Sequence, residues 1–223
     1  KQEIRLPMPT NTTEKAFEAC CEKYLLSKHK YQSGSPSDYD AEFCIDKRFF
    51  WEFLEKTQSD QLDKLRRQSD YKRLILERLD RKIKADGIVA VLKKGLDIDD
   101  AHLDLLYGNV YNNLNPEVIA RFNANIFSIT RQVHFSSDNP ELSVDTVLFV
   151  NGIAIITAEL KNLWTGQSVY DAVKQYQKRN ASEKLFSLAR CIVHFALDSE
   201  AIRMTTKLAG ESTVFLPFNK GYN

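Results

Sequence analysis

Three charged residues in one apolar segment have the types and spacing that can do chemistry. The segment SVDTVLFVNGIAIITAELKN, residues 143–162, carries Asp145, Glu159 and Lys161. Its two apolar runs flank Asn151-Gly152, which predicts a buried β-hairpin, because Asn-Gly is a frequent hairpin turn. A carboxylate buried in such strands is costly unless it is paired or binds metal. A structural salt bridge at the strand ends is the alternative that composition leaves open.

The register of this hairpin decides whether the two carboxylates can share a metal ion. A strict two-residue turn pairs Asp145 with Ala158 and directs Glu159 to the opposite face of the sheet. A three-residue loop over residues 150–152 pairs Asp145 with Thr157, so that both carboxylates lie on one face. We therefore predict the three-residue loop or an equivalent bulge.

On one face, these residue types suit a magnesium site. Two hard carboxylates fit Mg²⁺, which keeps several waters and completes its shell with phosphate oxygens. The metal polarises a phosphodiester and lowers the pKa of an attacking water. Lys161 would orient that water or stabilise charge on the phosphate. The pattern Asp…Glu-x-Lys thus indicates phosphodiester hydrolysis, but it is common by chance, so the surrounding elements must support it.

Helical periodicity dominates the first half of the chain. Residues 12–28 predict a helix, with Asn11 and Glu14 at the spacing of a capping box. Residues 47–94 predict several helices, separated by glycines that follow basic last turns. We assign the region of about 40–110 to a helical insertion.

Strand patterns begin after residue 124. Segments rich in β-branched and aromatic residues cover 125–136, 142–151, 152–161, 190–198 and 201–207. Helices are expected over about 167–180 and, as a short one, over 182–188. This order predicts an α/β fold, in which a mixed central sheet over about 124–210 is flanked by helices.

Composition excludes several classes of protein. The 223 residues have a formal charge of +1 and are 43% hydrophobic, which fits one large globular domain and gives no global sign of nucleic-acid or membrane binding. No apolar run of about 18 residues predicts a membrane span. The cysteines form no CxxC and no zinc spacing, which fits a reducing cytoplasm; they are Cys20, Cys21, Cys44 and Cys191.

Together these segments resemble a known family. The sequence is similar to the N-terminal endonuclease domain of the R (restriction) subunit of type I restriction enzymes, in the PD-(D/E)XK nuclease superfamily. Val144 stands where that motif often has proline. The matching runs are TEKAFE (13–18), NPEVIARFNANIFSITRQVHFS (115–136), SVDTVLFVNGIAIITAELKN (143–162), TGQSVYDAVKQYQKRN (165–180), RCIVHFALDSEAIRMTTKLAG (190–210) and STVFLPFNKG (212–221).

The resemblance implies a restriction-endonuclease-like fold and Mg²⁺-dependent cleavage of double-stranded DNA. It implies methyltransferase (modification) and specificity subunits as partners, and helicase-like motor domains that use ATP to translocate DNA. The eight glycines include no G-x-x-x-x-G-K-[ST] phosphate loop, so ATP binding is expected only in motor domains outside this chain. The ending FLPFNKGYN suggests a piece of a longer protein.

The resemblance also implies roles for individual residues. Asp145 and Glu159 would be metal ligands and Lys161 the catalytic lysine. The family uses an acidic residue on its first helix, for which Glu18 is the first choice and Glu14 the second. An ordinary solvated Glu18 is the alternative.

The helix after the lysine departs from the pattern of related nucleases, which carry Gln-x-x-x-Tyr. Tyr176 fits the tyrosine, but Ala172 stands four residues before it, and Arg179 stands four residues after Gln175. Tyr176 and Gln175 are therefore candidates for the site or for DNA contact, with core packing the alternative for the tyrosine.

Other polar residues divide between DNA contacts and structural roles. Arg131 and Lys174 are candidate DNA contacts, whereas His134 and His194 lie in strand patterns and fit structural roles better. The basic residues over 64–84 alternate with acidic ones, which favours a solvated, salt-bridged helix over a phosphate-binding surface.

Three functions remain in competition. The leading hypothesis is a DNA endonuclease domain; a catalytically silent docking module of the restriction complex and a stand-alone nuclease of DNA repair are the others. The intact Asp145, Glu159 and Lys161 favour activity over a silent module. The helical insertion and the FLPFN segment favour a restriction subunit over a repair enzyme.

Overall fold

A mixed nine-stranded sheet organises the protein. The computed structural model describes residues 13–108 and 115–218. The main path of the sheet runs β1-β6-β7-β8-β9-β10-β11, with β3 paired to β2 and to β8. The β1–β6 and β8–β9 pairs are parallel, while the other pairs are antiparallel. The strands are β1 (Gln32–Ser33), β2 (Tyr39–Asp40), β3 (Ile45–Asp46), β6 (Phe127–His134), β7 (Ser143–Val150), β8 (Ile153–Leu160), β9 (Val193–Leu197), β10 (Ile202–Thr205) and β11 (Leu216–Pro217).

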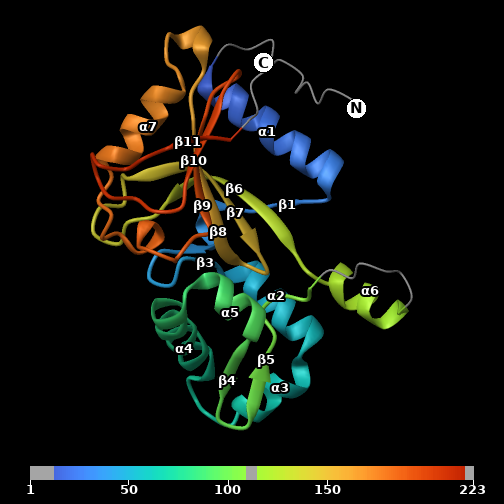
Figure 1. The fold of residues 1–223 in the computed structure, drawn as a ribbon. Helices are drawn as coiled ribbons and strands as arrows, with labels where there is room; N and C mark the ends of the chain where they lie inside the picture. The colour runs from blue at the N-terminus through green and yellow to red at the C-terminus, as the bar shows by residue number, and fades with distance from the viewer. Residues whose placement is uncertain (1–12, 109–114, 219–223) are drawn as a thin grey trace.

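Helices α1 (Glu14–His29) and α7 (Val169–Lys178) lie on either side of this sheet (Figure 1). Helix α1 contacts β1, β6 and β8, whereas α7 contacts β8, β9 and β10. Successive residues of a strand point to opposite faces of the sheet, so β8 contacts α1 with one set of side chains and α7 with the other. The α/β fold with a flanked mixed sheet is confirmed. The short helix expected over 182–188 is only a 3-10 turn, Lys184–Phe186.

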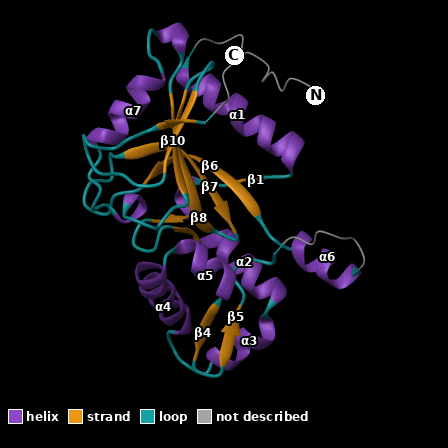
Figure 2. Ribbon diagram, viewed as in Figure 1, coloured by secondary structure: helices purple, strands orange, loops and turns teal. Residues whose placement is uncertain are grey.

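The insertion forms the other end of the molecule (Figures 1 and 2). Its helices are α2 (Lys47–Thr57), α3 (Ser59–Leu65), α4 (Tyr71–Asp86) and α5 (Ile88–Lys94), and α6 (Pro116–Asn123) follows them. The expected helices are therefore present. A two-stranded sheet, β4 (Leu96–Ile98) with β5 (Ala101–Leu103), was not expected, since each strand is only three residues long.

The β7–β8 turn differs from the predicted loop. Val150 pairs with Ile153, so only Asn151-Gly152 turns the chain, and the three-residue loop over 150–152 is wrong. Both turn residues have left-handed backbone, with φ of 48° and 75°. These angles fit the mirror-image turns that match the twist of a hairpin.

A bulge in β8 nevertheless places Asp145 and Glu159 on the same face of the sheet. Phe149 pairs with Ala154, but Leu148 pairs with Ile156, so Ile155 is an extra residue in β8. An inserted residue shifts the register by one and exchanges the faces of every residue beyond it. The bulge alternative is thereby confirmed.

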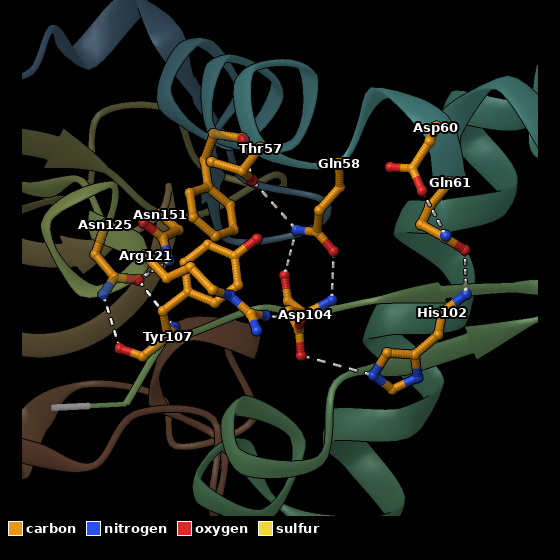
Figure 3. A network of polar contacts seen from close by, with 11 residues as sticks. Thr57, Gln58, Asp60, Gln61, His102, Asp104, Tyr107, Arg121, Asn125 and Asn151 are labelled. Carbon is orange, nitrogen blue, oxygen red and sulfur yellow. Dashed lines mark hydrogen bonds and ion pairs between the residues drawn. The ribbon is translucent and has the colours of Figure 1, made fainter. Parts of the chain in front are cut away.

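Asn151 fastens the turn to the insertion (Figure 3). Its Oδ1 accepts from the Ile126 N–H at 2.7 Å, and its Nδ2 donates to Leu105 O and Asn125 Oδ1, both at 2.9 Å. Asn125 in turn accepts from the Tyr107 N–H at 3.0 Å. A buried amide with its polar atoms satisfied holds the hairpin and the insertion in one arrangement.

The side chain of Gln58 makes a second connection within the insertion, to the backbone of Asp104 (Figure 3). Its side chain donates to Asp104 O at 2.8 Å and accepts from the Asp104 N–H at 2.6 Å, as a neighbouring strand would. Arg121 of α6 then pairs with the Asp104 carboxylate at 2.7 Å. Helices α2, α3 and α6 are thus tied to the chain that follows β5. No helix within 13–108 or 115–218 has the length and apolar character of a membrane span.

Candidate active site

The two hairpin carboxylates lie across from each other. Beyond the bulge Thr146 pairs with Ala158, so the next residue, Asp145, lies opposite Glu159 and not Thr157 as expected. Asp145 Oδ2 accepts from the Leu160 N–H at 2.7 Å, which fixes its side chain against β8. Opposed residues of an antiparallel pair share a face. The register therefore brings both predicted metal ligands together.

Gln132 adds an acidic residue of α1 to this pair. Its Nε2 donates to Glu18 Oε1 at 3.0 Å and to Asp145 Oδ1 at 3.3 Å. Gln132 has a φ of 51° and lies between the paired residues Arg131 and Val133 of β6. This role could not be predicted from the sequence, because nothing in a strand pattern marks a glutamine with left-handed backbone.

Glu18 is buried, so its interpretation as a solvated residue is wrong. Only 2% of the residue is exposed, and Oε2 has no hydrogen-bond partner. Burial raises the pKa of Glu18, the bond from Gln132 opposes this rise, and the nearby Asp145 carboxylate adds to it. An unpaired buried carboxylate oxygen is costly, and a cation would satisfy it.

Glu14 takes a role that the expected capping box does not explain. Thr13 caps α1, its side chain accepting from the Ala16 N–H, whereas Asn11 lies outside the described residues. Glu14 Oε1 instead pairs with Lys161 Nζ at 3.1 Å. Both glutamates proposed for the first helix therefore reach the site, Glu18 at Asp145 and Glu14 at Lys161.

Glu159 is fully buried, and Arg179 is its direct counter-ion. The guanidinium of Arg179 donates to Glu159 Oε1, while Oε2 has no partner. Burial raises the pKa of Glu159 to about 8, against the lowering effect of Arg179 and with a further rise from Asp145. Two carboxyl groups packed together disfavour the charged state of both, which is the condition that a divalent cation relieves.

The donor set fits a hard cation. Asp145 contributes carboxylate oxygens, and the partnerless Oε2 atoms of Glu159 and Glu18 are buried beside it. The side chains in the described ranges form no set of three or more His, Cys, Asp or Glu that would hold a metal unaided. Mg²⁺ does not require such a cage, because it is usually bound by one or two carboxylates, waters and substrate phosphates.

Comparison with known proteins identifies the family of the chain. A family model described as "Type I restriction enzyme R protein N terminus" matches residues 12–213. The chain belongs to this family. No curated protein matches it significantly. Membership of this family implies DNA and the other subunits of a restriction complex as partners.

The other candidate residues differ in their burial and in their contacts. Tyr176 is buried and its OH lies 2.8 Å from Thr157 Oγ1, which places it in the core beside His194. Arg131 pairs with Glu22 of α1 at 2.7 Å. Lys174 is exposed on α7, and Gln175 is half-buried next to it.

Proposed function

We propose that this chain is a Mg²⁺-dependent endonuclease domain that hydrolyses phosphodiester bonds of double-stranded DNA. One observation carries the proposal: the Ile155 bulge sets Asp145 opposite Glu159, and Lys161 directly follows the strand that carries Glu159. Within a type I R subunit, cleavage would follow ATP-driven translocation by motor domains outside this sequence. Modification and specificity subunits would select the DNA.

Each residue has a separate part in this chemistry. Asp145 and Glu159 would hold Mg²⁺, which supplies Lewis acidity and a more acidic bound water. Lys161 would donate hydrogen bonds from its ammonium group to the attacking water or to the phosphate oxygens. Glu14 holds that amino group at 3.1 Å, and Gln132 keeps Glu18 and Asp145 together.

The decisive experiment uses the assembled restriction complex. Glu159→Ala and Lys161→Ala are compared with wild type, and ATP-dependent DNA cleavage and ATP hydrolysis are measured separately. Cleavage should fall by roughly 10²–10³-fold, the usual effect of removing a transition-state stabiliser, while ATP hydrolysis stays unchanged. Lys23→Ala, an exposed lysine of α1, is the matched control.

Two results would contradict the proposal. Cleavage by both variants at the wild-type rate would favour the silent docking module. Loss of ATP hydrolysis together with cleavage would show that the residues support assembly or the motor instead of the chemical step.

A further inference from the structure

We infer that Arg179 is a positioning residue, which holds one oxygen of Glu159 and thereby reserves the other for a divalent cation. The inference rests on the proposed function, since it assigns the manner in which that metal is held. Arg179 stands four residues after Gln175, at one of the two positions where the sequence departs from the Gln-x-x-x-Tyr pattern of related nucleases.

Arg179 joins three elements at one guanidinium. It is the C-cap residue of α7, and its side chain is only 8% exposed. The Nη2 atom donates to Glu159 Oε1 in β8 and, at 2.7 Å, to Ser143 O at the start of β7. The same nitrogen therefore fixes the distance between the two strands that carry the metal ligands.

Two aromatic rings restrict the guanidinium further. Its central carbon lies 4.8 Å from the ring centre of Phe135 and 5.2 Å from that of Phe186. The two rings pack edge to face, 4.7 Å between centroids. A planar guanidinium stacks in such a corner and keeps its donors aimed, whereas an ammonium on a flexible stem does not.

This arrangement gives the two oxygens of the Glu159 carboxylate different surroundings. Oε1 is engaged by Arg179, and Oε2 is buried without a partner in the neighbourhood of Asp145. A cation at Oε2 would bind through a single oxygen, which leaves room for the waters and phosphate oxygens that Mg²⁺ requires. Partners that orient metal ligands in this way typically contribute 10–100-fold to metal affinity.

A competing role for Arg179 predicts that its removal changes metal affinity in the opposite direction. If the guanidinium blocked the site as a substitute cation, its removal would free Glu159 and tighten metal binding. Positioning and blocking are therefore separated by the direction of one measured change.

The test is calorimetric titration of the 223-residue chain with Mg²⁺, without DNA or nucleotide. Arg179→Met should weaken Mg²⁺ binding by roughly 10–100-fold, and Arg179→Lys should fall between it and wild type. Lys178→Met, the exposed neighbour on α7, should bind as wild type does. Unchanged or tighter binding by Arg179→Met would overturn the inference.

A second variant keeps the test valid if Arg179→Met fails to fold. Phe186→Leu retains the charge and removes one ring of the corner, so Mg²⁺ affinity should fall severalfold; wild-type affinity would overturn the inference. A wild-type chain that binds no Mg²⁺ refutes the metal-dependent function, and the inference with it. Binding by wild type that Arg179→Met leaves intact refutes the inference alone.

Discussion

The Asn151-Gly152 turn offers a direct test of how the hairpin is positioned. In Gly152→Ala a Cβ would lie 2.4 Å from Phe50 N and 2.5 Å from Asp46 O, both of them backbone atoms. Gly152 O already accepts from the Asp46 N–H at 2.7 Å, so the turn lies against the start of α2. Neither partner can yield without moving that helix.

The expected cost follows from two separate effects. A side chain at a φ of +75° costs about 1–2 kcal/mol. Overpacking against backbone adds about 1–3 kcal/mol. We expect Gly152→Ala to lower the free energy of unfolding by about 2–5 kcal/mol, or the Tm by roughly 4–20 °C for a chain of this size.

Two other glycines separate these effects in urea unfolding. Gly166 has a φ of +76° but nothing within 4 Å of its added Cβ, so Gly166→Ala should cost only about 1–2 kcal/mol. Gly108 has neither feature, and Gly108→Ala should leave stability unchanged or raise it by up to about 1 kcal/mol. A Gly152→Ala cost equal to that of Gly166→Ala would refute the close approach of the turn to α2.

Two further predictions concern buried polar side chains of the central sheet. Thr157 Oγ1 lies 2.8 Å from Tyr176 OH and 2.7 Å from His194 Nδ1, so Thr157→Val should lower the free energy of unfolding by about 1–3 kcal/mol in denaturant titrations. Thr146 Oγ1 is buried without a partner, so Thr146→Val should cost nothing; equal costs would contradict this assignment. Burial lowers the pKa of His194 to about 4 from an ordinary 6.5, so the unfolded chain binds its proton first as pH falls. The stability of wild type relative to His194→Gln should therefore drop by up to about 3 kcal/mol between pH 7 and pH 4, and a flat difference would exclude a buried neutral imidazole.

The sequence was informative where local chemistry decides the structure. Apolar runs around Asn151-Gly152 predicted the hairpin, and the same runs made Asp145 and Glu159 conspicuous. Glycines after basic turns marked the ends of α4 and α5, at Gly87 and Gly95. These features depend on neighbours in the chain, which is why they could be predicted.

Features that depend on distant segments were missed. The sequence cannot locate a bulge among consecutive isoleucines, because Ile155 differs from Ile156 only in its partner across the sheet. Gln132 meets Glu18 across 114 residues, and Arg179 meets Glu159 across 20. Such contacts follow from how α1 and α7 pack on the sheet, which no local pattern encodes.

The Ile155 bulge also limits how this hairpin can change. With the two-residue turn, six residues run from Asp145 to Val150 and seven from Ile153 to Glu159, and the bulge takes up the extra residue so that both carboxylates share a face. Deleting Ile155 would remove the bulge and still keep Asp145 opposite Glu159, because the two runs of residues would then be equal in length. With Ile155 present, a three-residue turn without the bulge would also keep Asp145 and Glu159 on one face. For a fixed number of residues between the two carboxylates, turn length and bulge are therefore exchangeable, and only their sum is constrained.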